Sequence, residues 1–231
     1  FKQKTAYEML RSLVGSEMCI RDRYKIDSYT SFQNFALYSS HNKVERYFVI
    51  YDLIKRSLPI QGDVIEFGIW NGNNTVFISK ILSVLKSNKK IFGVDHFKGL
   101  DKKDFSGFDK SEFIDRWKGN YEQLQDVIKF FELDNISIIN SHVMHTKKYL
   151  DKDQKFSFVY IDVDLYKPTM QILDIIKDYV VKGSIICFDE GNNENFPGEQ
   201  KALEEFLERY PDEYDIEYLD CECPDVILIK K

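Results

Sequence analysis

The sequence predicts an α/β fold with an open, mostly parallel, seven-stranded sheet and an antiparallel C-terminal strand. Two observations carry this prediction. Short apolar runs alternate with longer segments whose apolar residues recur every three or four positions, which is typical of a sheet with helices between its strands. The last two runs are joined by a loop too short for a parallel crossover, so these strands are expected to pair antiparallel.

Seven apolar runs are the expected strands. Several of them are apolar at successive positions and end at glycine or at an acid, which favours central parallel strands buried on both faces. The expected strands are residues 64–68, 91–95, 136–140, 156–161, 184–188, 214–219 and 226–229.

Helices are expected between these runs, at residues 44–57, 74–86, 121–131 and 202–210 and after the fourth strand. Pro168 is expected to open that helix, because the first turn does not need its missing amide hydrogen. The apolar stripe of the helix is expected to run to Val180, and Lys182-Gly183 to end it. The polar, glycine-dotted residues 98–120 are expected to form an insertion.

The first 23 residues are predicted to be foreign to the native protein. Ser12 to Arg23 match, in one reading frame, a transposase adapter used to prepare sequencing libraries, and the chain starts at Phe1, as expected of a fragment. The alternative is a short amphipathic helix. Residues 1–23 are set aside from the fold prediction, as a tag would be.

The rest of the chain is predicted to consist of an N-terminal cap or lid, residues 24–58, and one main domain, residues 59–231. Tyr24 to Tyr38 is aromatic and polar without a clear period, and the following helix is stopped by Pro59. No linker or repeat marks a further domain.

Composition narrows the classes of partner. Lys and Arg total 32 against 38 Asp and Glu, a net charge of -6, and no basic tract occurs, so a nucleic acid is not expected as the main partner. No apolar run approaches the roughly 18 residues of a membrane span. The four cysteines are too few and too unevenly spaced for a disulfide scaffold. A cytoplasmic protein is therefore expected, with a homo-oligomer left open.

Acidic residues gather at the ends of the expected strands, where ligands bind in open parallel sheets. These residues are Glu66, Asp95, Asp162, Asp164, Asp189 and Glu190. Carboxylates brought together there repel one another unless their pKa values rise or a cation binds. Oxygen ligands alone favour Mg²⁺ or Ca²⁺, and the alternative is a set of solvated or lysine-paired acids. If the strand continued, Asp162 and Asp164 would point to opposite faces, which would leave one of them as a direct ligand.

The glycine turn after the first strand is the second candidate for a ligand site. Gly68 and Gly72 would let the backbone approach a ligand at the amino end of the next helix, or serve the turn alone. The dinucleotide fingerprint G-x-G-x-x-G is absent, because Trp70 occupies its middle glycine position. Asp95 is placed to accept hydrogen bonds from a ribose diol, or to cap a helix.

With these motifs in place, the sequence resembles the macrocin O-methyltransferase (TylF-like) family, over roughly residues 60–210. The resemblance rests on Asp162-Val-Asp-Leu-Tyr-Lys-Pro-Thr169, Glu66-Phe-Gly-Ile-Trp-Asn-Gly72, Asp95-His-Phe-Lys-Gly99, Gly183-Ser-Ile-Ile-Cys-Phe-Asp-Glu190 and Phe196-Pro-Gly-Glu-Gln-Lys-Ala202. It implies a Rossmann-like fold and an S-adenosylmethionine-dependent O-methyltransferase that acts on a hydroxyl of a sugar or glycosylated natural product.

The resemblance also implies roles for residues. The cofactor S-adenosylmethionine would lie against Glu66, Gly68, Asn71, Gly72, Asp95 and Ser141, with Asp95 on its ribose. A magnesium ion would be held by Asp162, Asp189 and Glu190, and Asp164 would act as general base beside Asp162. The usual family pattern has two aspartates where this chain has Asp189-Glu190, and a second glycine where it has Ser184.

Two other functions stay open from the sequence: a nicotinamide-dependent oxidoreductase on the same scaffold, against which the missing fingerprint argues, and a non-catalytic cofactor-binding protein.

The remaining residues of interest have ordinary interpretations. His142 and His145 suit a polar loop or an adenine edge, and Cys221 and Cys223 lack the second pair that a zinc site needs. Trp117 and Tyr121 suit core packing or an acceptor pocket.

Overall fold

The computed structural model describes residues 25–27, 30 and 33–231. The chain divides into two compact units, Phe1–Val49 and Ile50–Lys231. The first unit contains the short helix α3, Phe35–Tyr38, and the beginning of α4, His41–Ser57, with the rings of Phe35 and Tyr47 in edge contact at 5.8 Å. The prediction for residues 1–23 lies outside the described residues. The lid function of residues 24–58 stays a prediction, and the boundary between the units falls inside α4.

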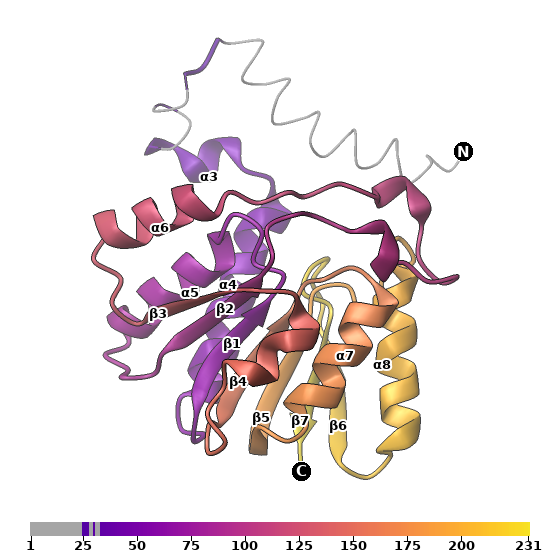
Figure 1. Cartoon of the computed structure of the whole chain (residues 1–231). Helices are drawn as coiled ribbons and strands as arrows, with labels where there is room; N and C mark the ends of the chain where they lie inside the picture. The colour runs from indigo at the N-terminus through magenta and orange to yellow at the C-terminus, as the bar shows by residue number, and fades with distance from the viewer. Residues whose placement is uncertain (1–24, 28–29, 31–32) are drawn as a thin grey trace. The chain divides into compact units, whose positions relative to one another are not determined.

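The second unit is an α/β sandwich around one sheet (Figure 1). Its strands are β1 Asp63–Phe67, β2 Ile91–Asp95, β3 Ile136–Asn140, β4 Phe156–Ile161, β5 Val180–Phe188, β6 Tyr214–Tyr218 and β7 Val226–Lys230. Its remaining helices are α5 Asn73–Val84, α6 Tyr121–Phe130, α7 Tyr166–Ile176 and α8 Pro197–Arg209, with the short 3₁₀ turns η1 Lys102–Asp104, η2 Ser111–Phe113 and η3 Val143–Lys148. Along the described chain, no helix is both long and apolar enough to cross a membrane.

Within the described residues, seven strands form one sheet in the order β3-β2-β1-β4-β5-β7-β6. The pairs from β3 to β5 are parallel, whereas β7 is antiparallel to both of its neighbours. The predicted fold class, with its antiparallel C-terminal strand, is confirmed. β7, the last strand of the chain, lies between β5 and β6, so that β6 and not β7 is the edge strand.

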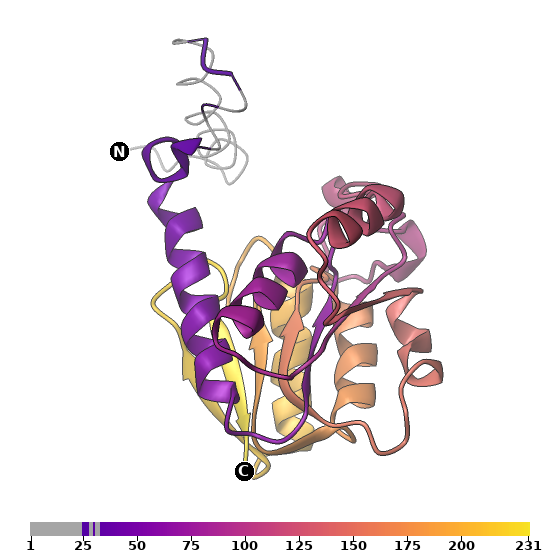
Figure 2. The ribbon, with the colours of Figure 1, turned by 90° about the vertical axis from the view of Figure 1, so that its left-hand side faces the viewer.

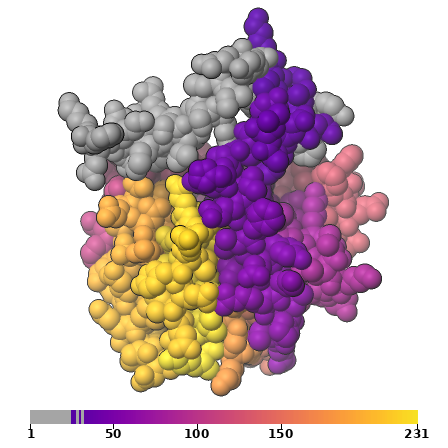
Figure 3. Space-filling model, turned by 180° about the vertical axis from the view of Figure 1, so that it is seen from behind, coloured from indigo at the N-terminus to yellow at the C-terminus, as the bar shows by residue number. Residues whose placement is uncertain are grey.

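Helices cover both faces of this sheet. α7 and α8 pack on one face, and α5 lies on the other together with the Ile50–Ser57 part of α4 (Figure 2). Arg56 near the end of α4 forms a two-bond ion pair with Glu217 of β6, at 2.9 and 3.2 Å, and Figure 3 shows these two segments side by side. β4 runs through the middle of the sheet, and all six of its residues are buried. Each fully buried apolar side chain there contributes roughly 1.5–3 kcal/mol of transfer free energy.

The structure corrects the predicted path between β4 and β5. α7 begins at Tyr166, two residues before Pro168, so the proline stands inside the first turn rather than at its start. α7 ends at Ile176, and Val180 belongs to β5 instead of the helix. Gly183 is not a helix end. It has a φ of +86° in an irregular part of β5, where the pairing with β4 jumps from Phe156–Val180 to Phe158–Ile185. Val180 continues the helical spacing of the apolar residues in α7, and the irregular pairing after it interrupts the strand pattern. The sequence therefore predicted a helix where β5 begins.

Candidate active site

The acidic residues singled out in the sequence lie at one edge of the sheet. β1, β4 and β5 are neighbours and parallel, so the residues after Ile161 and Phe188 emerge at the same end, at the top of the sheet in Figure 1. β1 lies between β2 and β4, and the direction of winding changes there. This is the place in an open α/β sheet where ligands bind.

Three carboxylates converge at this edge. Asp162, Asp164 and Glu190 each offer an oxygen atom, and these atoms lie within 4.8 Å of one another. The strand does not continue through these residues, because β4 ends at Ile161 and Asp164 takes a left-handed φ of +62°, so the alternation expected of a continued strand does not apply to Asp162 and Asp164. Val163 between them is buried in the core and anchors the turn. The reversal of the backbone therefore brings two acids from one tripeptide to the same point.

Asp189 belongs to a second group, which it forms with Glu190 and Cys223. Its carboxylate accepts a hydrogen bond from the buried hydroxyl of Tyr160, and its amide donates to the carbonyl of Ile161 at 2.9 Å. Glu190 is common to both groups. Asp162 and Asp189, two of the predicted metal ligands, thus each share a group with the third, Glu190.

Glu190 and Glu199 are two buried acids of the site that contact each other. The Glu190 amide donates to Glu199 Oε1 at 3.1 Å, while Oε2 of each side chain is buried without a hydrogen-bond partner. Burial, and then the negative charges of Asp189, Asp164 and Asp162, raise the pKa of Glu190 well above its ordinary value. Burial and the charge of Asp164 raise the pKa of Glu199 in the same direction. Carboxylates held so closely favour a proton or a cation between them.

The glycine turn after β1 is tied to Asp95. Trp70 and Phe97 donate their amides to the two oxygens of this carboxylate, at 2.8 and 2.6 Å. Asp95 therefore holds two turns of the backbone and does not cap a helix, and each oxygen keeps a further lone pair for a ligand. Gly72 has a φ of +80° and is the N-cap residue of α5, which leaves the first amides of that helix facing the turn.

Gly68 connects the glycine turn to the acids. Its φ is +82°, and a Cβ atom there would lie 1.6 Å from the carbonyl oxygen of Asp162. Only glycine fits where the β1 turn and the β4 turn touch.

The other predicted cofactor residues lie around this turn. Glu66 is buried in β1 and accepts a hydrogen bond from the hydroxyl of Thr75 in α5. Asn71 is exposed, and its side-chain oxygen accepts from the amide of Asn120 at 3.2 Å. Ser141 follows β3 and donates its amide to the carbonyl of Asp95 at 2.9 Å. These contacts bring the ends of β1, β2 and β3 together, and the role of each residue in cofactor binding stays a prediction.

Two histidines lie beside the Asp95 turn. His142 Nε2 lies 3.0 Å from Asp104 Oδ2, and His96 completes a group that resembles a metal site in composition. Their Nδ1 atoms, however, accept the amides of Met144 and Lys98, both at 3.2 Å. A neutral imidazole that accepts at Nδ1 carries its proton at Nε2, whereas a metal-bound histidine donates from its second nitrogen. Both Nδ1 atoms are thus in contact with backbone amides, and His142 Nε2 with Asp104.

The aromatic residues of the insertion pack against α8 and the glycine turn. Phe113 is buried and stacks on Phe196, with ring centroids 5.1 Å apart, and Trp117 contacts both rings. Tyr121 lies 5.2 Å from Phe97. Trp117 and Tyr121 thus pack against neighbouring rings, and a role in an acceptor pocket stays a prediction.

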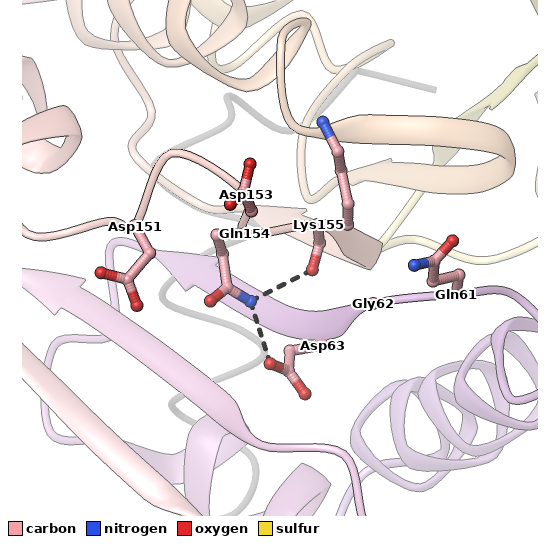
Figure 4. Close-up of a pocket in the computed structure, with 7 residues that line it drawn as sticks. All are labelled: Gln61, Gly62, Asp63, Asp151, Asp153, Gln154 and Lys155. Carbon is pink, nitrogen blue, oxygen red and sulfur yellow. Dashed lines mark hydrogen bonds between the residues drawn. The ribbon is translucent and has the colours of Figure 1, made fainter.

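A separate pocket lies at the opposite edge of the sheet, where β1 and β4 begin (Figure 4). Gln154 bridges Asp63 Oδ2 and the carbonyl of Lys155 there, at 2.9 and 3.2 Å. Asp151 and Asp153 also line it, but it contains none of the predicted site residues. This pocket is therefore no part of the acid site.

The sequence model of the macrocin O-methyltransferase (TylF) family matches residues 50–224. The chain belongs to this family. It is, accordingly, an S-adenosylmethionine-dependent O-methyltransferase, and the predicted family resemblance is confirmed. Family membership decides against the nicotinamide-dependent oxidoreductase. No sequence among the curated proteins matches the chain significantly.

Solved structures support the fold of this TylF-family chain. The calicheamicin methyltransferase CalS11 superposes with a TM-score of 0.76 at 21% identity, covering 100% of this chain and 95% of its own. The O-methyltransferase NovP gives 0.70 at 16% identity, covering 81% and 80%. An O-methyltransferase from Bacillus cereus, solved in complex with SAH, gives 0.55 at 11% identity, covering 95% and 91%. These likenesses establish the Rossmann-like methyltransferase architecture.

The structure adds two acids that the sequence reasoning did not single out. Glu199 stands in the first turn of α8, within the quoted Phe196–Ala202 motif, and Asp225 precedes β7. Asp225 Oδ2 accepts the amide of Asn192 at 3.0 Å, and its Oδ1 is buried without a partner. An acid in the first turn of a helix that follows an acid-ending strand was the available signal for Glu199. No signal in the sequence pointed to Asp225, because only the antiparallel pairing of β7 with β5 brings this residue close to the acid site.

Proposed function

We propose that this methyltransferase transfers the methyl group of S-adenosylmethionine to a hydroxyl of a sugar or glycosylated natural product, with a Mg²⁺ ion held at the acid site. The observation that carries the metal is the convergence of Asp162, Asp164 and Glu190, whose oxygens lie within 4.8 Å of one another. A buried Glu190 oxygen without a partner stands in the same group. Oxygen donors of this kind suit a hard divalent cation.

Asp162, Asp189 and Glu190 would hold the ion, since Asp162 and Asp189 each offer an oxygen within 4.8 Å of an oxygen of Glu190. Tyr160 holds the Asp189 carboxylate by its hydroxyl, and Glu199 holds the backbone of Glu190. Glutamate in place of the usual second aspartate fits because the turn after β5 is buried, so its longer side chain stays beside the others. When bound, the ion supplies positive charge that makes an acceptor hydroxyl more acidic.

The residues of this chain orient the reaction and accept the proton. Asp164 is our proposed general base, since its carboxylate lies beside Asp162 at the edge of the site and is half-buried. It takes the hydroxyl proton while the oxygen displaces the sulfonium sulfur from the methyl carbon in line. Bound S-adenosylmethionine would supply the methyl group and would leave as S-adenosylhomocysteine, whose sulfur would keep the electron pair of the broken bond. Alignment of oxygen, carbon and sulfur supplies much of the rate.

The cofactor is proposed to lie along the ends of β1 to β3. Asp95 would bind the ribose hydroxyls with its remaining lone pairs, and the glycine turn from Gly68 to Gly72 would lie against the methionine part. Asn71 in the glycine turn and Ser141 after β3 would also contact the cofactor. Glu66 would act indirectly, because its carboxylate accepts a hydrogen bond from the Thr75 hydroxyl and so fixes α5.

The acceptor class is inferred from relatives. One solved relative carries the description TDP-rhamnose 3'-O-methyltransferase, and it matches this chain at 21% identity with a TM-score of 0.72. A sugar hydroxyl is only weakly acidic, so a site with both a cation and a carboxylate base suits it. Incubating the chain with S-adenosylmethionine and a panel of nucleotide sugars, followed by mass spectrometry, should show a gain of one methyl group.

The test of the metal is the variant Asp162→Ala. We expect it to lower turnover at least about 100-fold while S-adenosylmethionine still binds, because the cofactor residues lie on other strands. Asp153→Ala is the matched control, since Asp153 is an exposed aspartate at the opposite edge of the sheet. Chelation should abolish turnover and Mg²⁺ restore it. Full activity in excess chelator would refute the metal.

A further inference from the structure

The Cys221-Glu-Cys223 segment, which has no part in the proposed reaction, reaches the acid site. β7 pairs antiparallel with β5, and Val226 faces Phe188. The residues just before β7 therefore lie beside those just after β5. Cys223 Sγ stands 4.0 Å from Glu190 Oε1, and its sulfur lies within 4.8 Å of ligand atoms of both Asp189 and Glu190.

A thiol sulfur together with two carboxylates differs from the oxygen-only ligand sets that Mg²⁺ prefers. Thiolate is the ligand that Zn²⁺ and Co²⁺ prefer over the hard ions. A zinc ion with its sulfur at about 2.3 Å and its oxygens at about 2.0–2.2 Å separates sulfur from oxygen by about 3.5 Å. The observed 4.0 Å between Cys223 Sγ and Glu190 Oε1 needs an approach of only a few tenths of an ångström.

A second observation points to a ligand at this place. Oε2 of Glu190 is buried without a hydrogen-bond partner, and the residue is 7% exposed. Burying an oxygen without a hydrogen-bond partner destabilises the fold, and a bound cation would compensate for that cost. Cys221 is differently placed, because its sulfur is directed at the carbonyl oxygen of Cys223, at 3.2 Å. The two cysteines of one loop are thus unequal with respect to the acids.

We propose that Cys223, Asp189 and Glu190 form a site for a thiophilic divalent ion, Zn²⁺, next to the magnesium position. The inference rests on the proposed function, since both ions use Glu190. Zn²⁺ and Mg²⁺ therefore compete, and Zn²⁺ inhibits methyl transfer through the Cys223 thiolate. Binding releases the thiol proton to solvent, and no electron transfer is involved.

The test uses Co²⁺ as a coloured substitute for Zn²⁺ on the full chain, freed of metal and kept reduced with a phosphine. We expect a thiolate-to-cobalt charge-transfer absorption that one equivalent of Zn²⁺ removes. Cys223→Ser should abolish the absorption and weaken Zn²⁺ binding at least about tenfold. Cys221→Ser is the matched control and should keep both. No absorption in the unaltered chain, or the same absorption in Cys223→Ser, overturns the proposal.

A parallel titration separates this proposal from the proposed function. Mn²⁺, a substitute for Mg²⁺, is titrated into Cys223→Ser and followed by electron paramagnetic resonance. Mn²⁺ binding without any cobalt–thiolate absorption in the unaltered chain refutes the thiolate site alone. Absence of both refutes the thiolate site and the magnesium site together. Mn²⁺ binding in Cys223→Ser, with the absorption confined to chains that retain Cys223, supports both.

Discussion

Replacing Gly68 by alanine tests whether the glycine turn and the acid turn are one rigid unit. The new Cβ would lie 1.6 Å from the carbonyl oxygen of Asp162, where real Cβ atoms stay beyond 3.0 Å, so about 1.4 Å of movement is required. Both partners are held: the Gly68 amide donates to Val94 at 3.0 Å, and the Asp162 amide donates to Phe67 at 2.9 Å. The movement therefore breaks at least one of these hydrogen bonds.

The expected loss of stability follows from these contacts. A left-handed backbone costs an L-residue about 1–2 kcal/mol, and each lost hydrogen bond about 1 kcal/mol. The free energy of unfolding should fall by about 2–4 kcal/mol, which for a domain of this size lowers Tm by about 5–15 °C. A shift of this size at Asp162 should also reduce kcat by about 100-fold.

Thermal unfolding followed by circular dichroism measures the first effect, and methyl transfer at saturating substrate the second. Gly107→Ala is the matched control, because a Cβ there meets nothing within 4 Å and no strained φ is involved. Its Tm should change by no more than about 2 °C. If Gly68→Ala unfolds within 2 °C of the unaltered chain, the contact between the two turns is not the constraint inferred from the structure.

Three further predictions concern single acids. Asp95→Ala should weaken S-adenosylmethionine binding by about 10–100-fold in calorimetry, because it removes a charged acceptor and frees two backbone amides; unchanged affinity would contradict the ribose assignment. Burial raises the pKa of Asp225 to about 6 from an ordinary value of 3.8, so the stability that its protonated form gives is present below about pH 4 and lost as the pH rises to 6. Between pH 4 and pH 7, the free energy of unfolding of Asp225→Asn should therefore rise by about 1 kcal/mol relative to that of the unaltered chain, measured by urea unfolding without metal. Parallel pH curves for the two chains would count against this prediction. Glu199→Ala should cost about 1–3 kcal/mol by leaving the buried Glu190 amide unpaired, whereas Glu199→Gln, which keeps an acceptor, should cost less than half as much; equal losses would rule out this role.

Local sequence patterns were enough for most of the fold. β2, β3 and β4 begin and end where the apolar runs do. For β4 the reason is that a parallel strand buried on both faces needs apolar residues at successive positions over a short length. The error between α7 and β5 has a local cause as well. Val180 continues the helical spacing by chance, and the bulge at Gly183 breaks the strand pattern that would have revealed it.

The sequence by itself also determined which acids end the strands, since strand ends and their residue types are local properties. Only the tertiary structure decided how those acids share a site. The left-handed turn at Asp164 brings two carboxylates together that alternation would separate. The insertion of β7 beside β5 brings Cys223 and Asp225 to residues more than 30 positions earlier in the chain. Such contacts depend on strand order and backbone handedness, which no single stretch of sequence specifies.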